Sequence, residues 1–462
     1  MLIIREIAGL QPEQAFAALS DEPGLVWLDS AAPEDARSRH AYLCARPFRR
    51  IEASDGTVTI DGMPVAGDPF SVLDAELARW RIVAGMAPVP FAGGAVGVLG
   101  YGLGRVLEQL PARHPDMPGV PDMSVGFYDV VVGFDLHAGR CWLMSSGFPE
   151  QGSGQIARAA ARADAVQERL EAVRLGPAGW NGTVRWRLEL DRCGYEQMVS
   201  RVLDYIRAGD VFQANVAMRA LAPRPDGASA AMLYQRLRAT SPAPFGAFVA
   251  CGSFALLSAS PERFVRLDAT GAIETRPIKG TSPRSKDPAA DRALREALEL
   301  SGKDRAENLM IVDLMRNDIG RVAVLGSMAV PLLCGVESFA SVHHLVSVVT
   351  AQLRPGLGPV DLLRATFPGG SVTGAPKVRA MEIIDAVEVA ARGPYCGTVA
   401  WIGFDGAMDS SIVIRSVVAT PGWLVAQAGG GIVADSDPAA EYDEMRLKLS
   451  PALRAFGSEE AR

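Results

Sequence analysis

The chain has 462 residues, of which 48% are hydrophobic and 21% are charged. This length corresponds to about three domain-sized units, and the composition excludes wholesale disorder. The net charge of −7, with no Lys/Arg run to offset it, argues against a nucleic-acid-binding protein. No stretch resembles a membrane helix or a signal peptide, and the six scattered cysteines form no CxxC pair. We therefore expect a cytoplasmic protein that binds neither membranes nor nucleic acids.

One composition shift divides the chain. An Ala- and Arg-rich helical stretch, residues 155–174, precedes the sequence Leu-Gly-Pro-Ala-Gly-Trp-Asn-Gly, in which loop-forming residues dominate. We expect an N-terminal lobe of residues 1–174, with short strands at 130–134 and 141–144. A linker of residues 175–184 and a catalytic domain of residues 185–462 follow.

The first elements after the linker are a helix and a strand. Asp191 can cap a helix whose apolar residues recur at helical spacing up to Gly209. Residues 211–217 alternate as a strand does, which places Gln213 and Asn215 on the same face.

Carboxylates gather on two predicted helices. Asp304 and Glu307 are three residues apart, so they share one face of a helix that runs to about residue 315. Asp437 and Pro438 begin a second helix, which presents Glu441, Glu444 and Lys448 on one face. Facing acidic pairs would form an all-oxygen Mg²⁺ site. Two solvated helix faces are the more frequent meaning of this pattern.

Glu262 and Lys279 are candidates for acid and nucleophilic chemistry. Glu262 follows an apolar run and could lie at a strand end in a cleft, where burial raises a carboxyl pKa. Lys279 lies between Ile and Gly, and a desolvated lysine is more easily neutralised and more nucleophilic. Surface positions for both residues are the alternative.

The C-terminal third holds three further signals. Residues 367–377 form a glycine-rich segment that opens a helix over 378–391, a position suited to anions. Residues 411–418 read as one strand interrupted by Arg415, which would meet a substrate carboxylate or a protein Asp or Glu. The triplet Gly429, Gly430 and Gly431 would allow close backbone approach to a ligand or form a plain turn.

Eight motifs in one order resemble the chorismate-utilising enzymes, and the resemblance is strong over about residues 185–453 and weak in the N-terminal part. They are GDVFQAN at 209–215, SPE at 260–262, PIKGT at 277–281, IVDLMRND at 311–318, VHHL at 342–345, GSVTGAPK at 370–377, GPYCG at 393–397 and GGGIVAD at 429–435. Anthranilate synthases and isochorismate enzymes typically carry alanine where this chain has Lys279. Water-using members have a lysine base where this chain has Gln213. The resemblance therefore implies amination of chorismate at C4 with ammonia.

The resemblance also implies residue roles. Lys279 is expected to attack C2 of chorismate, and Glu262 to protonate the departing C4 hydroxyl. Mg²⁺ is expected on Glu307 and Glu444, with Asp304 and Glu441 in support. The other expected substrate contacts and supporting residues are Gln213, Thr281, His344, Ser371, Thr373, Tyr395, Arg415, Gly429, Gly430, Gly431 and Lys448.

The family further implies an α/β (α+β) fold of two lobes, with stacked antiparallel sheets around a central cleft and helices outside. No Gly-x-Cys-x-Gly glutaminase motif is present. We therefore expect a separate glutamine amidotransferase subunit to supply the ammonia. Anthranilate synthase component I is one alternative function, and a non-catalytic regulatory paralogue is another.

Overall fold

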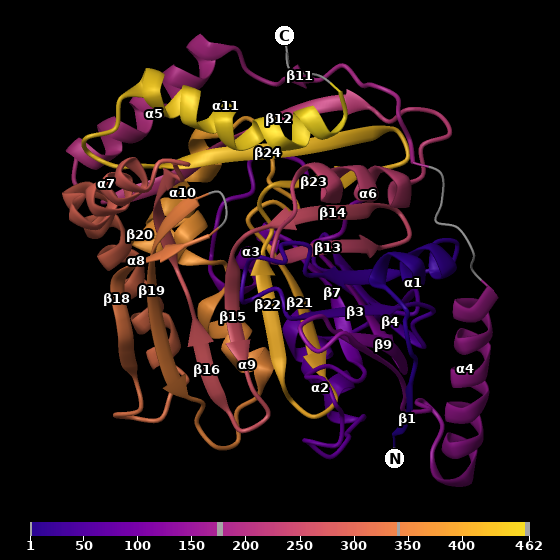
Figure 1. Cartoon of the computed structure of the whole chain (residues 1–462). Coiled ribbons are helices and arrows are strands. Elements are labelled where there is room, and N and C mark those ends of the chain that lie inside the picture. The colour runs from indigo at the N-terminus through magenta and orange to yellow at the C-terminus, as the bar shows by residue number, and fades with distance from the viewer. Residues whose placement is uncertain (1, 173–178, 340–341, 458–462) are drawn as a thin grey trace.

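Two antiparallel sheets lie face to face in the computed structural model (Figure 1), which describes residues 2–172, 179–339 and 342–457. Within these residues each sheet has 12 strands. The first sheet runs in the order β1 (Ile3–Glu6), β10 (Arg140–Ser145), β9 (Val130–Asp135), β3 (His40–Cys44), β2 (Val26–Asp29), β13 (Phe245–Ala250), β14 (Ala255–Ser260), β23 (Ser416–Ala419), β24 (Trp423–Ile432), β12 (Gln213–Pro223) and β11 (Arg187–Leu188), with β20 (Gly374–Ala375) paired to β12.

The second sheet runs in the order β17 (Ile278–Pro283), β19 (Val342–Gln352), β16 (Ala272–Thr275), β15 (Arg263–Leu267), β22 (Met408–Ile412), β21 (Thr398–Gly403), β7 (Gly94–Leu99), β8 (Met123–Tyr128), β4 (Arg49–Ser54), β5 (Thr57–Ile60) and β6 (Met63–Val65), with β18 (Ala329–Ser338) paired to β19. Alternation along the strands directs one set of side chains between the sheets. Val98 and Val399 from this sheet join Leu256 and Val425 from the first sheet in one buried cluster.

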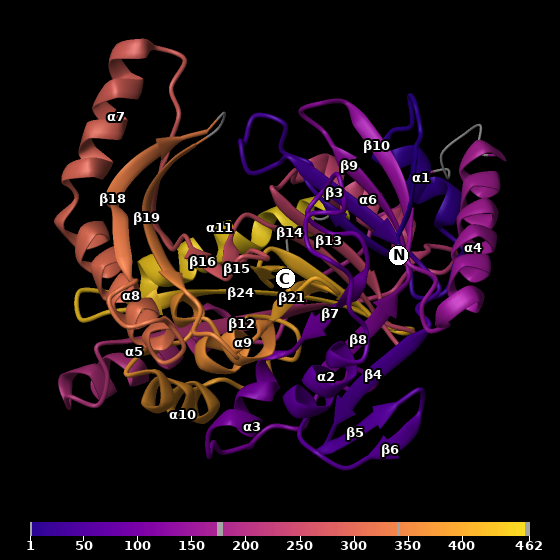
Figure 2. The ribbon, with the colours of Figure 1, turned by 90° about the horizontal axis from the view of Figure 1, so that it is seen from below.

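Helices cover the outer faces of both sheets. They are α1 (Pro12–Leu19), α2 (Pro69–Ala78), α3 (Gly104–Leu107), α4 (Gly152–Ala172), α5 (Arg192–Arg207), α6 (Ala230–Thr240), α7 (Pro288–Leu300), α8 (Gly302–Gly320), α9 (Pro359–Thr366), α10 (Lys377–Val387) and α11 (Pro438–Ala455), with 3₁₀ turns η1 (Tyr101–Leu103) and η2 (Gly370–Val372). In Figure 1, α11 and α5 lie over β24 and β12, and Met198 and Met445 anchor them in the buried cluster there. Figure 2 shows α7, β18 and β19 projecting together on the side away from α4.

Strands from both halves of the chain share both sheets. β2 pairs with β13, and β7 pairs with β21. The expected division at residues 174 and 185 stays a prediction, and residues 173–178, which include the start of the expected linker, lie outside the described residues. The α/β fold with stacked antiparallel sheets and outer helices is confirmed. No helix in the described part of the chain could span a membrane.

Most of the predicted local elements are present. The carboxylates of Asp191 and Asp437 accept hydrogen bonds from Gly194 N and Ala440 N, at 2.8 and 2.9 Å, and so cap α5 and α11. The predicted strands at 130–134 and 141–144 are β9 and β10, and the predicted helix at 155–174 is α4. The strand expected from residue 211 begins at Gln213.

Two predictions were wrong in extent or continuity. Residues 411–418 are not one strand: β22 ends at Ile412 in one sheet and β23 begins at Ser416 in the other. Arg415 lies in this crossing with a left-handed φ of 53°. The helix expected over 378–391 ends at Val387, because Glu388 turns into extended backbone and its carboxylate accepts a hydrogen bond from Ala217 N.

Candidate active site

Lys279 and Glu262 lie close enough together for each to shift the pKa of the other. Lys279 lies on β17, and Glu262 lies between β14 and β15, where only 9% of its surface is exposed. Burial lowers the pKa of Lys279, while Glu307 and Glu262 oppose that shift. Burial raises the pKa of Glu262, and the Lys279 ammonium opposes it. Thus a lysine that loses its proton readily lies near a carboxyl group that keeps its proton, as acid-assisted nucleophilic substitution requires.

The turn that contains η2 contacts both residues. Lys279 Nζ donates to Ser371 O at 3.3 Å, and the Ser371 side chain hydrogen-bonds to the Glu262 carboxyl group. The Thr373 hydroxyl donates to Gly369 O at 3.1 Å, within its own turn. The glycine-rich segment thus positions the lysine and the acid relative to each other.

The predicted carboxylates lie on α8 and α11 around the same space. Burial raises the pKa values of Glu307 and Glu441, and the negative charge of Glu444 contributes to both shifts. Asp304 lies under Gly280, where a Cβ would come within 2.9 Å of its Cγ. Glu441 accepts a hydrogen bond from the Ser436 hydroxyl at 2.6 Å. The carboxylates from the two helices therefore influence one another, and their excess negative charge fits a divalent cation.

These carboxylates do not form a closed ligand cage. Among the described residues, no three His, Cys, Asp or Glu side chains stand close enough together to hold a metal ion. Lys448 Nζ lies 2.6 Å from Glu444 Oε1. Burial raises the pKa of Glu444, but the ammonium groups of Lys448, Lys303 and Lys279 together lower it below its ordinary value. One of the four predicted metal ligands, Glu444, is therefore already paired with a lysine. The predicted magnesium ligands stay a prediction.

The glycine triplet belongs to strand β24 and is not a turn. Gly429, Gly430 and Gly431 pair with β12. A Cβ on Gly431 would lie 2.1 Å from Gln213 Nε2, and one on Gly430 would lie 2.9 Å from Glu441 Oε2. At Gly429 the close neighbour is backbone: a Cβ there would lie 2.0 Å from Val216 O, so this position requires glycine.

Arg415 and Tyr395 form the end of the site beside α11. Tyr395 is buried, and burial raises the pKa of its hydroxyl, so the ring is neutral. Tyr395 and Glu444 both lie close enough to interact electrostatically with the Arg415 guanidinium. In the described part of the chain, no Asp or Glu forms an ion pair with Arg415. A partly buried guanidinium without a protein carboxylate is suited to a carboxylate on a ligand. This observation favours the ligand over the protein partner that the sequence left open.

His344 lies on β19 opposite Thr281. The two side chains hydrogen-bond at 2.9 Å, between Thr281 Oγ1 and His344 Nδ1. Burial, with a contribution from Arg37, lowers the pKa of His344 to about 4, so its imidazole is neutral at pH 7. Its neighbour His343 is buried and bonds to Ser338 and Asp291, at 2.7 and 3.2 Å.

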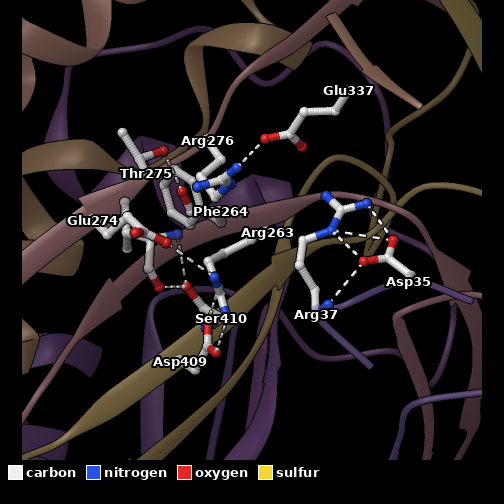
Figure 3. A network of polar contacts seen from close by, with 11 residues as sticks. Asp35, Arg37, Arg263, Phe264, Glu274, Thr275, Arg276, Glu337, Asp409 and Ser410 are labelled. Carbon is white, nitrogen blue, oxygen red and sulfur yellow. Dashed lines mark hydrogen bonds and ion pairs between the residues drawn. The ribbon is translucent and has the colours of Figure 1, made fainter. Parts of the chain in front are cut away.

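The sequence analysis missed two arginines. Arg37 comes from the N-terminal segment; its charge acts on Glu262 and His344, and Asp35 holds its guanidinium (Figure 3). Arg263 follows Glu262 and fixes that segment through Asp409, with two hydrogen bonds of 2.9 Å (Figure 3). The Arg37–Asp35 pair is local, but no spacing in the sequence could reveal that Arg37 lies near Glu262 and His344, or that Arg263 pairs with Asp409, because those partners come from distant segments.

Residues 25–454 match the family model described as chorismate binding enzyme. The chain belongs to the chorismate binding enzyme family. Aminodeoxychorismate synthase component 1 of Klebsiella aerogenes is 43% identical over 96% of both chains. The Escherichia coli protein of the same name is 41% identical over 95% of this chain and 94% of its own.

The chain is also similar to anthranilate synthase component 1 of Thermus thermophilus, with 37% identity over 97% of this chain and 96% of that relative. Among solved structures, anthranilate synthase component I from Streptococcus pneumoniae aligns with a TM-score of 0.82 and 30% identity. The alignment covers 90% of this chain and 92% of that one. The family resemblance and the fold expected from it are thereby confirmed. The individual site residues stay predictions.

Proposed function

We propose that this chain replaces the C4 hydroxyl of chorismate with an amino group, giving 4-amino-4-deoxychorismate for p-aminobenzoate biosynthesis. The observation that carries the proposal is Lys279, a half-buried and desolvated lysine whose charge interacts with the buried acid Glu262. The relatives named aminodeoxychorismate synthase component 1 support the same activity. The free cysteines of the described chain support placing this activity in the cytoplasm.

The site residues suggest an order of bond changes. Neutral Lys279 Nζ bonds to C2 while the ring double bond shifts and the C4–O bond breaks. Glu262 gives its proton to the departing oxygen, which leaves as water. Ammonia then bonds to C4 and the C2–N bond breaks, which frees Lys279 as the neutral amine. The ammonium group formed at C4 returns a proton to the Glu262 carboxylate. The sum is chorismate plus ammonia giving aminodeoxychorismate plus water. Covalent catalysis divides one difficult substitution into two easier ones.

Arg415 and Tyr395 would bind the enolpyruvyl carboxylate in this proposal. Glu307 and Glu444, with Asp304 and Glu441, would hold Mg²⁺. When bound, this ion would supply positive charge for the ring carboxylate of the substrate. Lys448 would then balance the charge of the carboxylates near Gly429.

The name "component 1" on the relatives supports a second component. We propose that a separate glutamine amidotransferase subunit supplies ammonia to this site. Free ammonium should replace that subunit in a test with the isolated chain.

The test is product identification. The purified chain is incubated with chorismate, Mg²⁺ and excess ammonium, and the product is identified by mass and ultraviolet spectrum. The expected product keeps the enolpyruvyl group and carries nitrogen at C4. Fluorescent anthranilate would overturn the proposal in favour of anthranilate synthase. Absence of product, even with a glutaminase subunit added, would indicate a non-catalytic paralogue.

A further inference from the structure

Arg392 is a buried arginine with no role in the reaction proposed above. It follows α10 and exposes 3% of its surface. Its guanidinium pairs with Glu388, at 2.7 Å between Nη2 and Oε1 and at 3.0 Å between Nε and Oε2. Glu388 Oε1 also accepts a hydrogen bond from Ala217 N of β12, at 2.8 Å.

The remaining donors of Arg392 bind main-chain carbonyls in two parts of the site. Nη1 donates to Val372 O at 2.9 Å, and Nη2 donates to Asn215 O at 2.6 Å. Val372 is flanked by Ser371, whose carbonyl accepts from Lys279 Nζ. Asn215 N donates in turn to Thr373 O at 2.7 Å, so strand β12 and this turn are joined twice.

The same guanidinium lies against two aromatic rings. Its carbon is 4.6 Å from the ring centre of Tyr101 and 5.9 Å from that of Tyr395. Tyr395 also lies close enough to Arg415 to interact with its guanidinium. One ion pair thus contacts the strand of Gln213, the turn beside Lys279 and the ring beside Arg415.

Stability alone is a weak reason for such a pair. Removing an arginine and a glutamate from water is costly, and apolar residues of similar size often serve a core equally well. The planar guanidinium group, whose N–H donors point in fixed directions, can instead hold three backbone segments in place relative to one another. Misplacing a reacting group by about 1 Å can cost about a hundredfold in rate.

We propose that Arg392 and Glu388 are a positioning pair that holds the turn of η2 against β12 and so fixes the Ser371 carbonyl where Lys279 Nζ meets it. The pair does not touch the reacting atoms. Its effect on turnover rests on the proposed function, whereas its effect on Lys279 can be measured without turnover.

Two variants test the pair. Arg392→Lys keeps the charge opposite Glu388 but replaces the two guanidinium nitrogens that bind Val372 O and Asn215 O with a single nitrogen. The double variant Arg392→Met/Glu388→Gln removes both charges and keeps an oxygen for Ala217 N. The matched control is Arg219→Met/Glu189→Gln, which removes another two-bonded Arg–Glu pair of β12 that lies outside the site.

Two quantities are measured for each variant, together with its melting temperature, which reports any general loss of stability. The first is kcat and KM for chorismate with saturating ammonium. The second is the rate at which acetic anhydride labels Lys279 without substrate, measured by peptide mass spectrometry, with exposed Lys303 as internal standard. We expect both Arg392 variants to lose about a hundredfold in kcat and to label severalfold faster at Lys279. The control should match the wild type in both.

Labelling of Lys279 at the wild-type rate in both Arg392 variants would overturn the proposal. Equal changes in the control pair would also overturn it, because they would reflect general loosening. If the wild-type chain makes no aminated product, the proposed function fails, while the labelling rates still decide whether the pair positions Lys279.

Discussion

Lys448 Nζ lies 2.6 Å from Glu444 Oε1 and donates to Gly429 O at 3.1 Å, so an ammonium group connects α11 to strand β24 at the predicted metal site. The carboxylate of Glu444 is thus already partly neutralised by the protein. Any cation that binds there must compete with this lysine or displace it.

This contact predicts the effect of Lys448→Met on magnesium binding. Loss of the ammonium leaves Glu444 with more uncompensated charge, so Mg²⁺ should bind about fivefold more tightly, the equivalent of one modest ion pair. Isothermal titration calorimetry at constant pH and salt measures this. Lys286→Met removes an equal charge on exposed chain away from the site and should leave the affinity unchanged. Unchanged or weaker binding in Lys448→Met would contradict the prediction.

Lys279→Ala should remove C4 amination with little effect on folding. The substitution deletes a desolvated amine and its hydrogen bond to Ser371 O. Loss of the nucleophile should lower kcat by at least about a hundredfold. A product assay with saturating ammonium and a thermal melt give the two values. A variant that still aminates C4 at the full rate would exclude the covalent lysine step.

Glu262→Gln should lower kcat by about a hundredfold or more, because the amide cannot give a proton to the departing hydroxyl. Burial raises the pKa of Glu262, so the acid form persists to higher pH than for an ordinary glutamate. Wild-type kcat should therefore fall as the pH rises through this raised pKa. The pH profile of the variant should lack that limb. A limb that survives in Glu262→Gln would assign the titration to another group.

Arg415→Lys should weaken chorismate binding more than it affects kcat. A lysine keeps the charge but loses the planar fork that binds a carboxylate with two parallel hydrogen bonds. The charged hydrogen bond that is lost predicts a rise in KM of about tenfold to a hundredfold. Steady-state kinetics with chorismate as the varied substrate measures it. An equal KM for the two proteins would mean that Arg415 does not bind the substrate carboxylate.

Local rules predicted the parts of the site that depend on one segment. The caps at Asp191 and Asp437 and the spacing of Asp304 with Glu307 need only neighbouring residues, and the structure has these helices where they were expected. The same rules failed at Arg415. β-Branched residues favour a strand on both sides of it, but the chain changes sheets there, and that is a property of the topology.

Contacts between distant segments could not be predicted from spacing. Arg392 binds Asn215 O across 177 residues, and the N-terminal Arg37 acts on Glu262. Local sequence left alternatives open for Lys279 and Arg415, because a functional lysine and a surface lysine have the same local sequence, and the family motifs favoured the functional roles. Lys448 and Glu444 are four residues apart and therefore lie on the same face of α11. Their ion pair could thus be expected from the sequence spacing.

The histidines predict a pH dependence of stability. The pKa of His344 is lowered to about 4 by burial, and burial also lowers the pKa of His40 to about 4, against an ordinary value near 6.5. Between these values the unfolded chain binds protons that the folded chain does not. The free energy of unfolding should therefore rise with pH from about 4 to about 6.5 and be constant above that range. Each histidine contributes at most about 1.4 kcal/mol per pH unit in this window.

His344→Asn keeps an amide that can bond to Thr281 Oγ1 and removes one of these titrations. Urea unfolding at pH 5, 6 and 7.5 should show a smaller slope for His344→Asn than for the wild type, and a still smaller slope when His40→Asn is added. A wild-type slope in the double variant would mean that both imidazoles stay accessible to protons in the folded chain, and that carboxylates cause the acid sensitivity.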